Sequence, residues 1–581
     1  MTDKKTASFM RSLCMGEIEE EIVLPYPEPT QAEAETLRAV FGTLASMLGS
    51  REKDFAAWDR AGEMPLGFLQ ELREAGLFGL VIPEEHGGMG FGSTAYSRAL
   101  QEIGRYDGSV ALTVGAHSSI GLRGLLLFGT DDQRRRYYPK LVTGEMIAAF
   151  ALTEPSAGSD AASIKTTAVR DGDAWVLNGE KIWITNGGMA DFFTVFAKTS
   201  MEGRGHITAF LVTRDMKGVS TGPHEDKMGI RASSTTTVVL EDVRVPSANV
   251  LGEVGMGFKV AMRILNAGRT GLGGGCVGGM KRLVELSTHQ ARDRSQFGQP
   301  IASFGLVKQK IGQMVIDCYV SESVVNLVAG LVDRGFEDTA VEAAISKVLA
   351  TELLFRSADE ALQIAGGGGY MRELPYERIL RDTRINRIFE GTNEILRLFI
   401  ALTGMNDVGQ ELKDLGASLK GIFDDPIKGF GLLSDYAKRR ASLVTGIRRT
   451  KAKWTMLDAS LAPEAAIFEQ ATTALAVTAD RILRKHGKRI IGQQFDTRRM
   501  ADVMIDLFSL AAVLSRVNAA VERDGKEKAA HELEIARTFA HQAKRRMDAC
   551  FAGVDDNADD GLRSLSAHVV ELGRYPWDNV N

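Results

Sequence analysis

The pattern of apolar residues changes at Phe150-Ala151-Leu152-Thr153-Glu154-Pro155-Ser156-Ala157-Gly158-Ser159-Asp160. Before this stretch, from about Ala32 to Glu145, apolar residues recur at helical spacing. After it, as far as about Leu251, short runs are rich in β-branched and aromatic residues. The turn itself, rich in Ser, Gly and Asp, offers backbone N–H groups and hydroxyls to an anion or a heterocycle. The stretch therefore predicts a junction between a helical and a β region, and either a binding turn or an ordinary interdomain turn.

The β region contains several predicted strands. Trp175–Leu177 and Lys181–Thr185 flank Asn178-Gly179, which is a strong signal for a β-hairpin turn. Further strands are predicted at 192–197, 207–212 and 235–240. Together they predict a small antiparallel barrel or sandwich over residues 150–253.

Helical patterns return after the β region. Val307–Val332 and Val341–Ile364 are two long examples, and they predict a helical bundle over residues 254–409. We expect residues 410–581 to form a further helical extension and residues 1–149 to form an N-terminal helical domain. The predicted fold is mainly α with a central β domain.

Composition excludes several functional classes. The net charge of the 581 residues is −5, so no positive field argues for nucleic acid. Cys14, Cys276, Cys318 and Cys550 form no CxxC pair, so we expect no metal site. No signal peptide is recognisable, no apolar run reaches the ~18 residues of a membrane span, and no peroxisomal address ends the chain. These features predict a cytoplasmic bacterial protein or a processed protein of the mitochondrial matrix or inner-membrane periphery.

Two glycine-rich stretches resemble nucleotide-binding loops superficially. Gly273–Gly278 matches GxGxxG, but no strand precedes it and no βαβ unit surrounds it. We therefore interpret it as small residues in a tightly packed helix. Gly366–Gly369 lacks the Lys-Ser/Thr of a P-loop, yet it predicts a backbone that another group approaches closely.

Four further motifs accompany the stretch at 150–160. They are Lys181–Gly187, Arg292–Gly298, which we expect to open the following helix, Gln363–Gly367 and Arg387–Arg397. In their order and spacing, and in the helix–β–helix texture around them, these five motifs resemble the acyl-CoA dehydrogenase family from about residue 30 to 405. The tail beyond residue 410, with Gly115–Gly121 and Met228–Ser233, resembles the very-long-chain branch, whose members carry an extra C-terminal helical domain.

The resemblance implies FAD as cofactor and a carboxylate that removes the α-proton of an acyl-CoA thioester. In the matching motif that carboxylate is Glu390. Some branches place the base one residue before an arginine that matches Arg269, but Gly268 stands there in this chain. The resemblance also implies that the backbone N–H of Glu390 and a flavin hydroxyl stabilise the enolate-like oxygen. A base of this kind needs a pKa raised toward neutrality by desolvation.

The family motifs imply further site residues. For the cofactor they are Phe150, Leu152, Thr153, Ser159, Trp183, Ile184, Thr185, Thr392, Asn393 and Glu394, with Arg294, Phe297, Gln363, Gly366 and Gly367 reaching the flavin of a neighbouring subunit. For the substrate they are Ser159, Asn266, Arg269, Phe389 and Gly391. The shared cofactor site implies a homodimer.

Two glycines bear on the length of the acyl chain that the protein accepts. Gly121 and Gly124 lie three residues apart on a predicted helix, and each glycine costs a helix about 1 kcal/mol. They indicate either a long acyl tunnel, as in the very-long-chain branch, or tight helix packing. A tunnel gains ~0.8 kcal/mol per buried methylene.

Partners follow from the same resemblance. The expected electron acceptor is electron-transferring flavoprotein. As alternative functions, the protein could be an acyl-CoA oxidase or a respiratory-complex assembly scaffold.

A basic segment precedes Trp454. Seven basic residues lie between Lys438 and Lys453, without an acidic one. This segment predicts either a peripheral contact with an anionic membrane or a solvated helix face.

Overall fold

The N-terminal helical region begins with a capping box. The side chain of Thr30 accepts from the N–H of Glu33, and the Glu33 carboxylate accepts from the N–H of Thr30. The helices are α3 (Gln31–Leu48), α4 (Glu52–Ala61), α5 (Leu66–Glu74), α6 (Ser93–Tyr106) and α7 (Gly108–Gly115), a π-helical turn (Ala116–Gly121), α8 (Arg123–Phe128) and α9 (Asp131–Val142). A second capping box, Thr130 with Gln133, starts α9.

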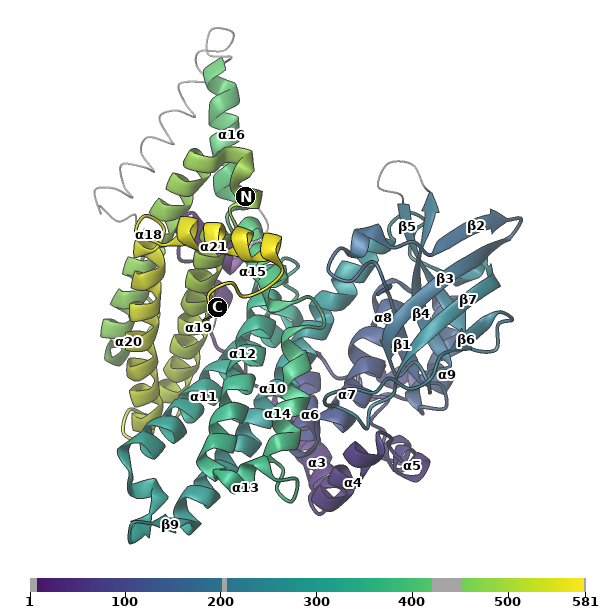
Figure 1. The fold of residues 1–581 in the computed structure, drawn as a ribbon, viewed down its shortest axis with the longest axis horizontal. Coiled ribbons are helices and arrows are strands. Elements are labelled where there is room, and N and C mark those ends of the chain that lie inside the picture. The colour runs from purple at the N-terminus through teal and green to yellow at the C-terminus, as the bar shows by residue number, and fades with distance from the viewer. Residues whose placement is uncertain (1–7, 201–205, 421–451, 579–581) are drawn as a thin grey trace. The chain divides into compact units, whose positions relative to one another are not determined.

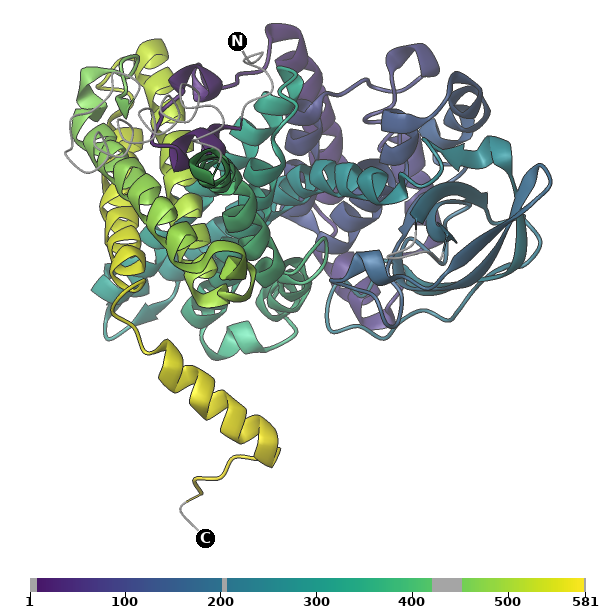
Figure 2. The same cartoon turned by 90° about the horizontal axis from the view of Figure 1, so that it is seen from above.

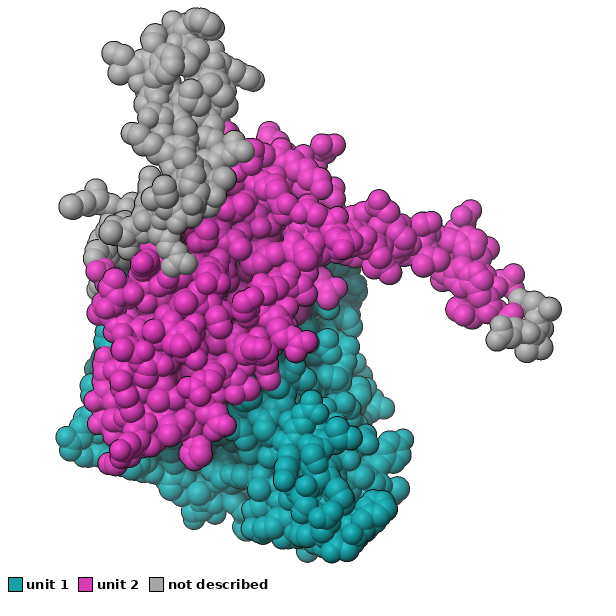
Figure 3. All heavy atoms as spheres, turned by 90° about the vertical axis from the view of Figure 1, so that its left-hand side faces the viewer, with its two compact units in different colours: residues 1–6, 25–396 teal, residues 7–24, 397–581 magenta. Residues whose placement is uncertain are grey.

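The computed structural model describes residues 8–200, 206–420 and 452–578. Contacts divide the chain into two compact units, Pro25–Leu396 and Ala7–Leu24 with Arg397–Asn581, coloured separately in Figure 3. The short N-terminal helices α1 (Phe9–Cys14) and α2 (Glu20–Val23) thus belong to the same unit as the C-terminal extension.

One eight-stranded sheet follows α9 among the described residues (Figure 1). Its strands are β1 (Ala148–Ala151), β2 (Thr167–Asp171), β3 (Ala174–Thr185), β4 (Phe192–Ser200), β5 (His206–Thr213), β6 (Val219–Thr221), β7 (Thr235–Pro246) and β8 (Val250–Leu251). The pairing order is β6-β7-β3-β2-β4-β5-β8, with β1 added on β4. Because β1 and β2 both pair with β4 in parallel, the sheet is mixed and not purely antiparallel as predicted.

The centre of the sheet is buried on both faces. Alternate residues of β4 belong to different cores: Phe192 and Phe196 join the core of the N-terminal helices, whereas Phe193 and Val195 join a core within the β region. The period of two along a strand produces this division. β4 therefore reads as a continuous apolar run, and the sheet is curled, as Figure 2 shows.

The prediction of a hairpin turn at Asn178-Gly179 is wrong. β3 runs through both residues, and the turn that joins β2 to β3 lies at Gly172, with φ 62°. Gly179 occupies a shift in the register between β3 and β7, where a Cβ would lie 2.4 Å from Thr166 Oγ1. Asn178 bonds across the sheet to Asp242. The dipeptide marks a β-bulge, which accepts the same residues as a tight turn.

The bundle that follows consists of α10 (Gly257–Asp293), α11 (Gly305–Asp333), α12 (Ala340–Ala365), α13 (Gly367–Tyr370) and α14 (Tyr376–Arg384), and then α15 (Asn393–Gly404). The interpretation of Gly273–Gly278 as packing residues is confirmed. A Cβ at Gly274 or Gly278 would lie 2.5 or 1.9 Å from a backbone oxygen of α6. Glycine lets the two helices approach each other this closely.

The stretch Arg292–Gly298 does not open α11 as predicted. It ends α10 and continues into a small hairpin of β9 (Ser295–Gln296) and β10 (Gln299–Pro300), with Phe297 and Gly298 at positive φ. Polar residues before a helix are an N-cap signal, but here Gly298 supports a two-residue turn.

The second unit is helical. It contains α16 (Asn406–Lys420), α18 (Ala462–His486), α19 (Gln494–Asp524), α20 (Ala530–Ala552) and α21 (Asp559–Leu572). Arg499 pairs with Asp559 at the start of α21, and Arg546 of α20 pairs with Asp506 of α19. Of the basic segment 438–453, every cation except Lys453 lies outside the described residues, so the membrane contact stays a prediction. The Trp454 ring packs against Phe468 with centroids 5.2 Å apart.

Two helical stretches bear on the expectation about membrane spans. Gly108–Phe128 and Gly305–Asp333 are long and apolar enough to cross a membrane by length and composition alone. Their apolar windows are 67% and 72% buried inside the protein. This burial is typical of core helices, so the finding is weak evidence for a membrane span.

Candidate active site

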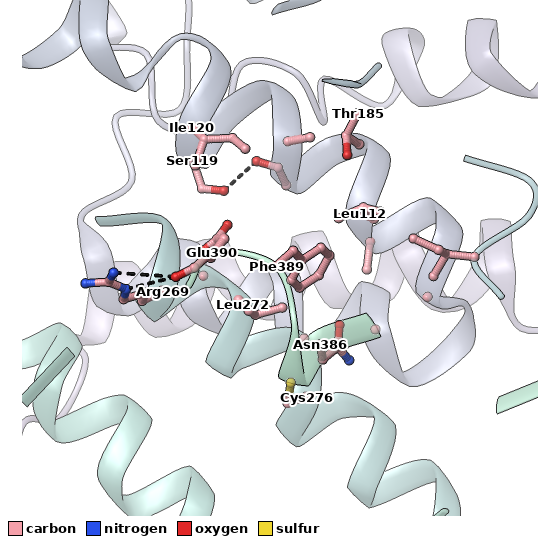
Figure 4. A pocket seen from close by; sticks show the side chains of 18 of the residues that line it. Leu112, Ser119, Ile120, Thr185, Arg269, Leu272, Cys276, Asn386, Phe389 and Glu390 are labelled. Atoms are coloured by element: carbon pink, nitrogen blue, oxygen red, sulfur yellow. Dashed lines mark hydrogen bonds between the residues drawn. The ribbon is translucent and has the colours of Figure 1, made fainter. Parts of the chain in front are cut away.

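A cavity of about 360 Å³ opens inside the first unit. Its walls come from α6, α7 and the π-helical turn, from the end of β1 and of β3, from α10, α12 and α14, and from the loop before α15. Figure 4 shows Glu390 and Phe389 from this loop facing Ser119, Ile120 and Leu112. The site therefore unites residues more than 200 positions apart in the sequence.

Glu390 lies in the loop between the 3₁₀ turn Ile385–Arg387 and α15. Its φ is 55° and that of Gly391 is 94°, two consecutive residues in the left-handed region. Its Oε2 atom is buried and has no hydrogen-bond partner among the described residues. Burial raises the pKa of Glu390 to about 7, while the charges of Arg269 and Lys347 act in the opposite direction. A buried, unpaired carboxyl with this pKa is suited to general-base chemistry.

Arg269 holds the backbone of Glu390. Its Nε and Nη2 atoms each lie 3.4 Å from the Glu390 carbonyl oxygen, which Figure 4 shows facing the guanidinium. Its Nη1 donates to Asn266 Oδ1 at 2.5 Å. Arg269 lines the cavity, and the side chain of Asn266 meets Arg269 from outside the cavity lining. The structure thus places both predicted substrate residues behind the candidate base.

Gly268 faces the carboxylate directly. A Cβ at this position would lie 3.2 Å from both Oε1 and Oε2 of Glu390, and 2.7 Å from Cγ2 of Ile120. The two positions at which the family places its base therefore converge on one point in space. With the carboxylate supplied by position 390, a glycine at 268 leaves it room.

The segment Phe150–Asp160 forms another wall. Phe150, Leu152, Thr153 and Ser159 line the cavity with Trp183, Ile184 and Thr185, so these seven residues border one space. Trp183 has φ 57°, and 64% of its surface is exposed. An exposed indole beside the hydroxyls of Thr153 and Thr185 fits a flat, polar-edged ring such as isoalloxazine.

A buried ion pair fixes this wall from behind. Lys181 Nζ lies 2.6 Å from Glu154 Oε1 and donates to the carbonyl of Leu152 at 3.2 Å. Glu154 also accepts from the N–H and the hydroxyl of Thr166. Burial lowers the pKa of Lys181 to about 8. The pair was not among the predicted residues, although Glu154 and Lys181 both stand inside the quoted motifs.

The residues expected to reach a neighbouring flavin lie outside this cavity lining. Phe297 is 93% exposed, and Arg294, Gln363, Gly366 and Gly367 are also exposed. A Cβ at Gly366 or Gly367 would meet nothing within 4 Å. These five residues offer a surface that another chain can approach.

The predicted residues 392–394 differ in their surroundings. Asn393 is 1% exposed, and its amide bonds to Lys347, Thr351 and Glu352 of α12. The Thr392 hydroxyl accepts from the N–H of Ile395 at the start of α15. Glu394 is exposed. The structure thus gives the Asn393 side chain a place inside the chain, and its contact with FAD stays a prediction.

Gly121 and Gly124 are packing residues rather than tunnel residues. Neither lines the cavity; a Cβ at Gly121 would lie 2.8 Å from Ala148, and one at Gly124 would lie 2.7 Å from Leu251. The glycines of α10 that line the cavity are Gly271, Gly275 and Gly279. Their spacing of four residues puts them on one helix face, whereas Gly274 and Gly278 face α6. This four-residue spacing in the sequence could have identified the glycines that line the cavity.

Family models match most of the chain. They are "Acyl-CoA dehydrogenase, N-terminal domain" at 35–145, "middle domain" at 149–243, "C-terminal domain" at 255–404, and "ACAD9/ACADV, C-terminal domain" at 459–575. The human very long-chain specific acyl-CoA dehydrogenase, mitochondrial, is 41% identical over 100% of this chain and 90% of its own.

Solved structures agree with these matches. An acyl-CoA dehydrogenase complexed with FAD from Bacillus anthracis is similar with a TM-score of 0.80 and 34% identity, covering 99% of this chain and 97% of its own. Butyryl-CoA dehydrogenase from Megasphaera elsdenii covers 64% of this chain and 98% of its own, with a TM-score of 0.62 and 35% identity. The chain belongs to the acyl-CoA dehydrogenase family, in the branch that carries the additional C-terminal helical domain.

Proposed function

We propose that this protein oxidises long or very-long-chain acyl-CoA to trans-2-enoyl-CoA, with Glu390 as the base that removes the α-proton. As a member of its family, the chain is an FAD-dependent acyl-CoA dehydrogenase of fatty-acid oxidation. The observation that carries the assignment of the base is the buried Oε2 of Glu390, which is unpaired among the described residues and faces the cavity.

The surroundings of Glu390 suit the removal of a weakly acidic proton. A base is most effective when its pKa lies near the working pH, and burial raises the pKa of Glu390 to about 7. An acyl chain in the cavity would displace water and raise this pKa further. Bound FAD supplies a hydride acceptor for the β-carbon.

The backbone around Glu390 can stabilise the developing negative charge. The N–H of Glu390 makes no hydrogen bond within the described residues, so it is free to donate to the thioester oxygen. Arg269 and the left-handed conformation hold this N–H in place. One such donor is worth on the order of 3 kcal/mol in a water-excluded site.

The cofactor residues are those of the cavity wall at 150–160 and 183–185. Phe150, Leu152 and Thr153 would border the flavin ring, Trp183 would stack near it, and Thr185 would reach its polar edge. Ser159 would serve both the flavin phosphate and the pantetheine arm. The Lys181–Glu154 pair would hold this wall in place through the carbonyl of Leu152.

A homodimer would complete the cofactor site. Phe297, at the tip of the β9–β10 hairpin, has 93% of its surface exposed, and a Cβ at Gly366 or Gly367 would meet nothing within 4 Å. An exposed phenylalanine and a guanidinium at Arg294 suit the flat ring and the pyrophosphate of a partner's FAD. Electron-transferring flavoprotein is the proposed acceptor.

The experiment is an anaerobic absorbance titration of the FAD-loaded protein with saturated acyl-CoA thioesters of increasing length. We expect bleaching of the flavin band, greatest for long chains. Reoxidation by electron-transferring flavoprotein without peroxide supports the acceptor, whereas rapid peroxide formation in air would assign an oxidase instead. An unbleached flavin with every thioester would reject the proposed function.

A further inference from the structure

Lys347 is buried completely inside the bundle, on α12. Its Nζ atom donates to the backbone carbonyl of Gly391 at 2.8 Å and to Oδ1 of Asn393 at 2.8 Å. Both acceptors are neutral, and no carboxylate of the described residues lies within ion-pair distance of Nζ. A lysine buried in this way costs free energy that a neutral residue would not.

Its two acceptors belong to the loop that carries Glu390. Gly391 follows the candidate base directly, and Asn393 begins α15. Helix α12 also holds this loop through Glu352, which accepts from Asn393 Nδ2 at 3.0 Å and pairs with Arg387 at 3.1 Å. Helix α12 therefore clamps the loop on both sides of Glu390.

The loop needs such a clamp because its backbone is strained. Glu390 is a non-glycine residue at φ 55°, and Gly391 follows at 94°. A left-handed residue of this kind costs on the order of 1–3 kcal/mol and persists where its surroundings determine it. Arg269 holds the carbonyl of Glu390 from one side, and Lys347 holds the carbonyl of Gly391 from the other.

A neutral donor would serve a purely structural clamp equally well, so the charge of Lys347 calls for its own explanation. Two cations of the described site act on the Glu390 carboxylate, Arg269 from α10 and Lys347 from α12. Tyr96 of α6 and Cys276 of α10 stay neutral at physiological pH, because burial raises the pKa of each to about 12.

We propose that Lys347 is a positioning residue for the base: it fixes the Glu390–Gly391 loop, and its buried positive charge favours the carboxylate form of Glu390. This inference rests on the proposed function, in which Glu390 removes the α-proton. Burial lowers the pKa of Lys347 to about 8, and the charge of Glu390 acts in the opposite direction, so each charge stabilises the other. Of the other charged groups near the loop, Glu352 and Arg387 pair with each other, and Glu394 is exposed.

The test is the pH dependence of anaerobic flavin reduction in FAD-loaded Lys347→Met and Lys347→Gln. Loss of the cation should move the acid limb of the rate profile to higher pH by about one unit. The rate near pH 7 should fall at least several-fold, whereas Lys347→Arg should keep the limb close to its wild-type position. Ser346→Ala is the matched control, because it removes a buried polar group from the same turn of α12 without touching the loop.

Each possible result either supports the proposed role of Lys347 or contradicts it. A shifted limb in the neutral variants, with an unshifted limb in Lys347→Arg and Ser346→Ala, supports the proposal. An unshifted limb in either neutral variant overturns it, and so does the failure of both to bind FAD, since Lys347 would then be required for folding itself. Glu390→Gln measured alongside separates the two claims: if that variant still reduces flavin, the proposed base is wrong, independently of Lys347.

Discussion

Gly268 and Glu390 occupy one point of the site from two directions: a Cβ on Gly268 would lie 3.2 Å from each carboxylate oxygen of Glu390. The glycine thus leaves room for the carboxylate of the proposed base, although a glycine weakens the interior of helix α10. The same Cβ would lie 2.7 Å from Cγ2 of Ile120, so a side chain at position 268 would crowd both Ile120 and the carboxylate.

Gly268→Ala should therefore slow flavin reduction even though alanine favours the helix. The added methyl group presses on the carboxylate and on Ile120, and a displacement of about 1 Å at a reacting group can cost on the order of 100-fold. Stopped-flow reduction measures the effect. Gly312→Ala on α11, where a Cβ would meet nothing within 4 Å, is the control. Equal rates in the two variants would contradict the crowding.

Glu390→Gln should bind FAD and acyl-CoA but leave the flavin oxidised, because the amide cannot accept the α-proton.

The stability of Glu390→Gln should also depend on pH differently from that of the wild type. Burial raises the folded-state pKa of Glu390 from 4.5 to about 7, so the folded protein binds the proton more tightly. Stability is therefore lost as pH rises between these values.

The free-energy difference between variant and wild type should then move in favour of Glu390→Gln by up to about 3 kcal/mol between pH 4.5 and pH 7.5. Thermal unfolding at several pH values measures it. A constant difference across this range would mean that the carboxyl titrates normally.

Lys181→Met should lose flavin and stability together. It leaves Glu154 buried without its cation, and breaking a buried pair in this way costs about 3–5 kcal/mol. The double variant Lys181→Met/Glu154→Gln should recover part of the loss, because no uncompensated charge remains. Flavin content after dialysis and Tm provide the two measurements. A double variant as unstable as the sum of the single ones would show that the pair is not coupled.

Gly275→Leu should shorten the preferred acyl chain. Gly275 lines the cavity, and a Cβ there would meet nothing within 4 Å, so a larger side chain has room to fill the space. Excluding about three methylenes would cost roughly 2.4 kcal/mol, or about 50-fold in kcat/KM for the longest thioesters. Gly312→Leu, at an exposed position outside the cavity, should leave the chain-length profile unchanged.

Phe297→Ser and Arg294→Ala should weaken FAD retention if a partner subunit completes the site. Light scattering of the wild type should show a flavin-loaded dimer, and each variant should release flavin more readily on dilution. A flavin-loaded monomer in the wild type would remove the shared site. Val169→Ser, at an exposed apolar position of β2, is the matched control.

Local sequence determined much of this protein. Helical spacing located α11 and α12 almost to the residue, the apolar runs located β4, β5 and β7, and the motif around Glu390 identified the candidate base. Each of these rests on neighbours within a few positions, because a helix or a strand expresses its own periodicity. The interpretation of Gly273–Gly278 held for the same reason: no strand precedes the glycines, so they could not form a dinucleotide loop.

Tertiary structure decided what depends on distant neighbours. The sequence could not distinguish a hairpin turn from a bulge at Gly179, because β7, some 60 residues later, determines the register there. Nor could it tell which glycines border the cavity, since Gly121 faces Ala148 while Gly275 faces open space. Lys347 becomes buried beneath the loop of Glu390 only when α12 and that loop pack together. Folding brings close the groups that desolvate a charge, so the electrostatics around the candidate base also depend on this packing.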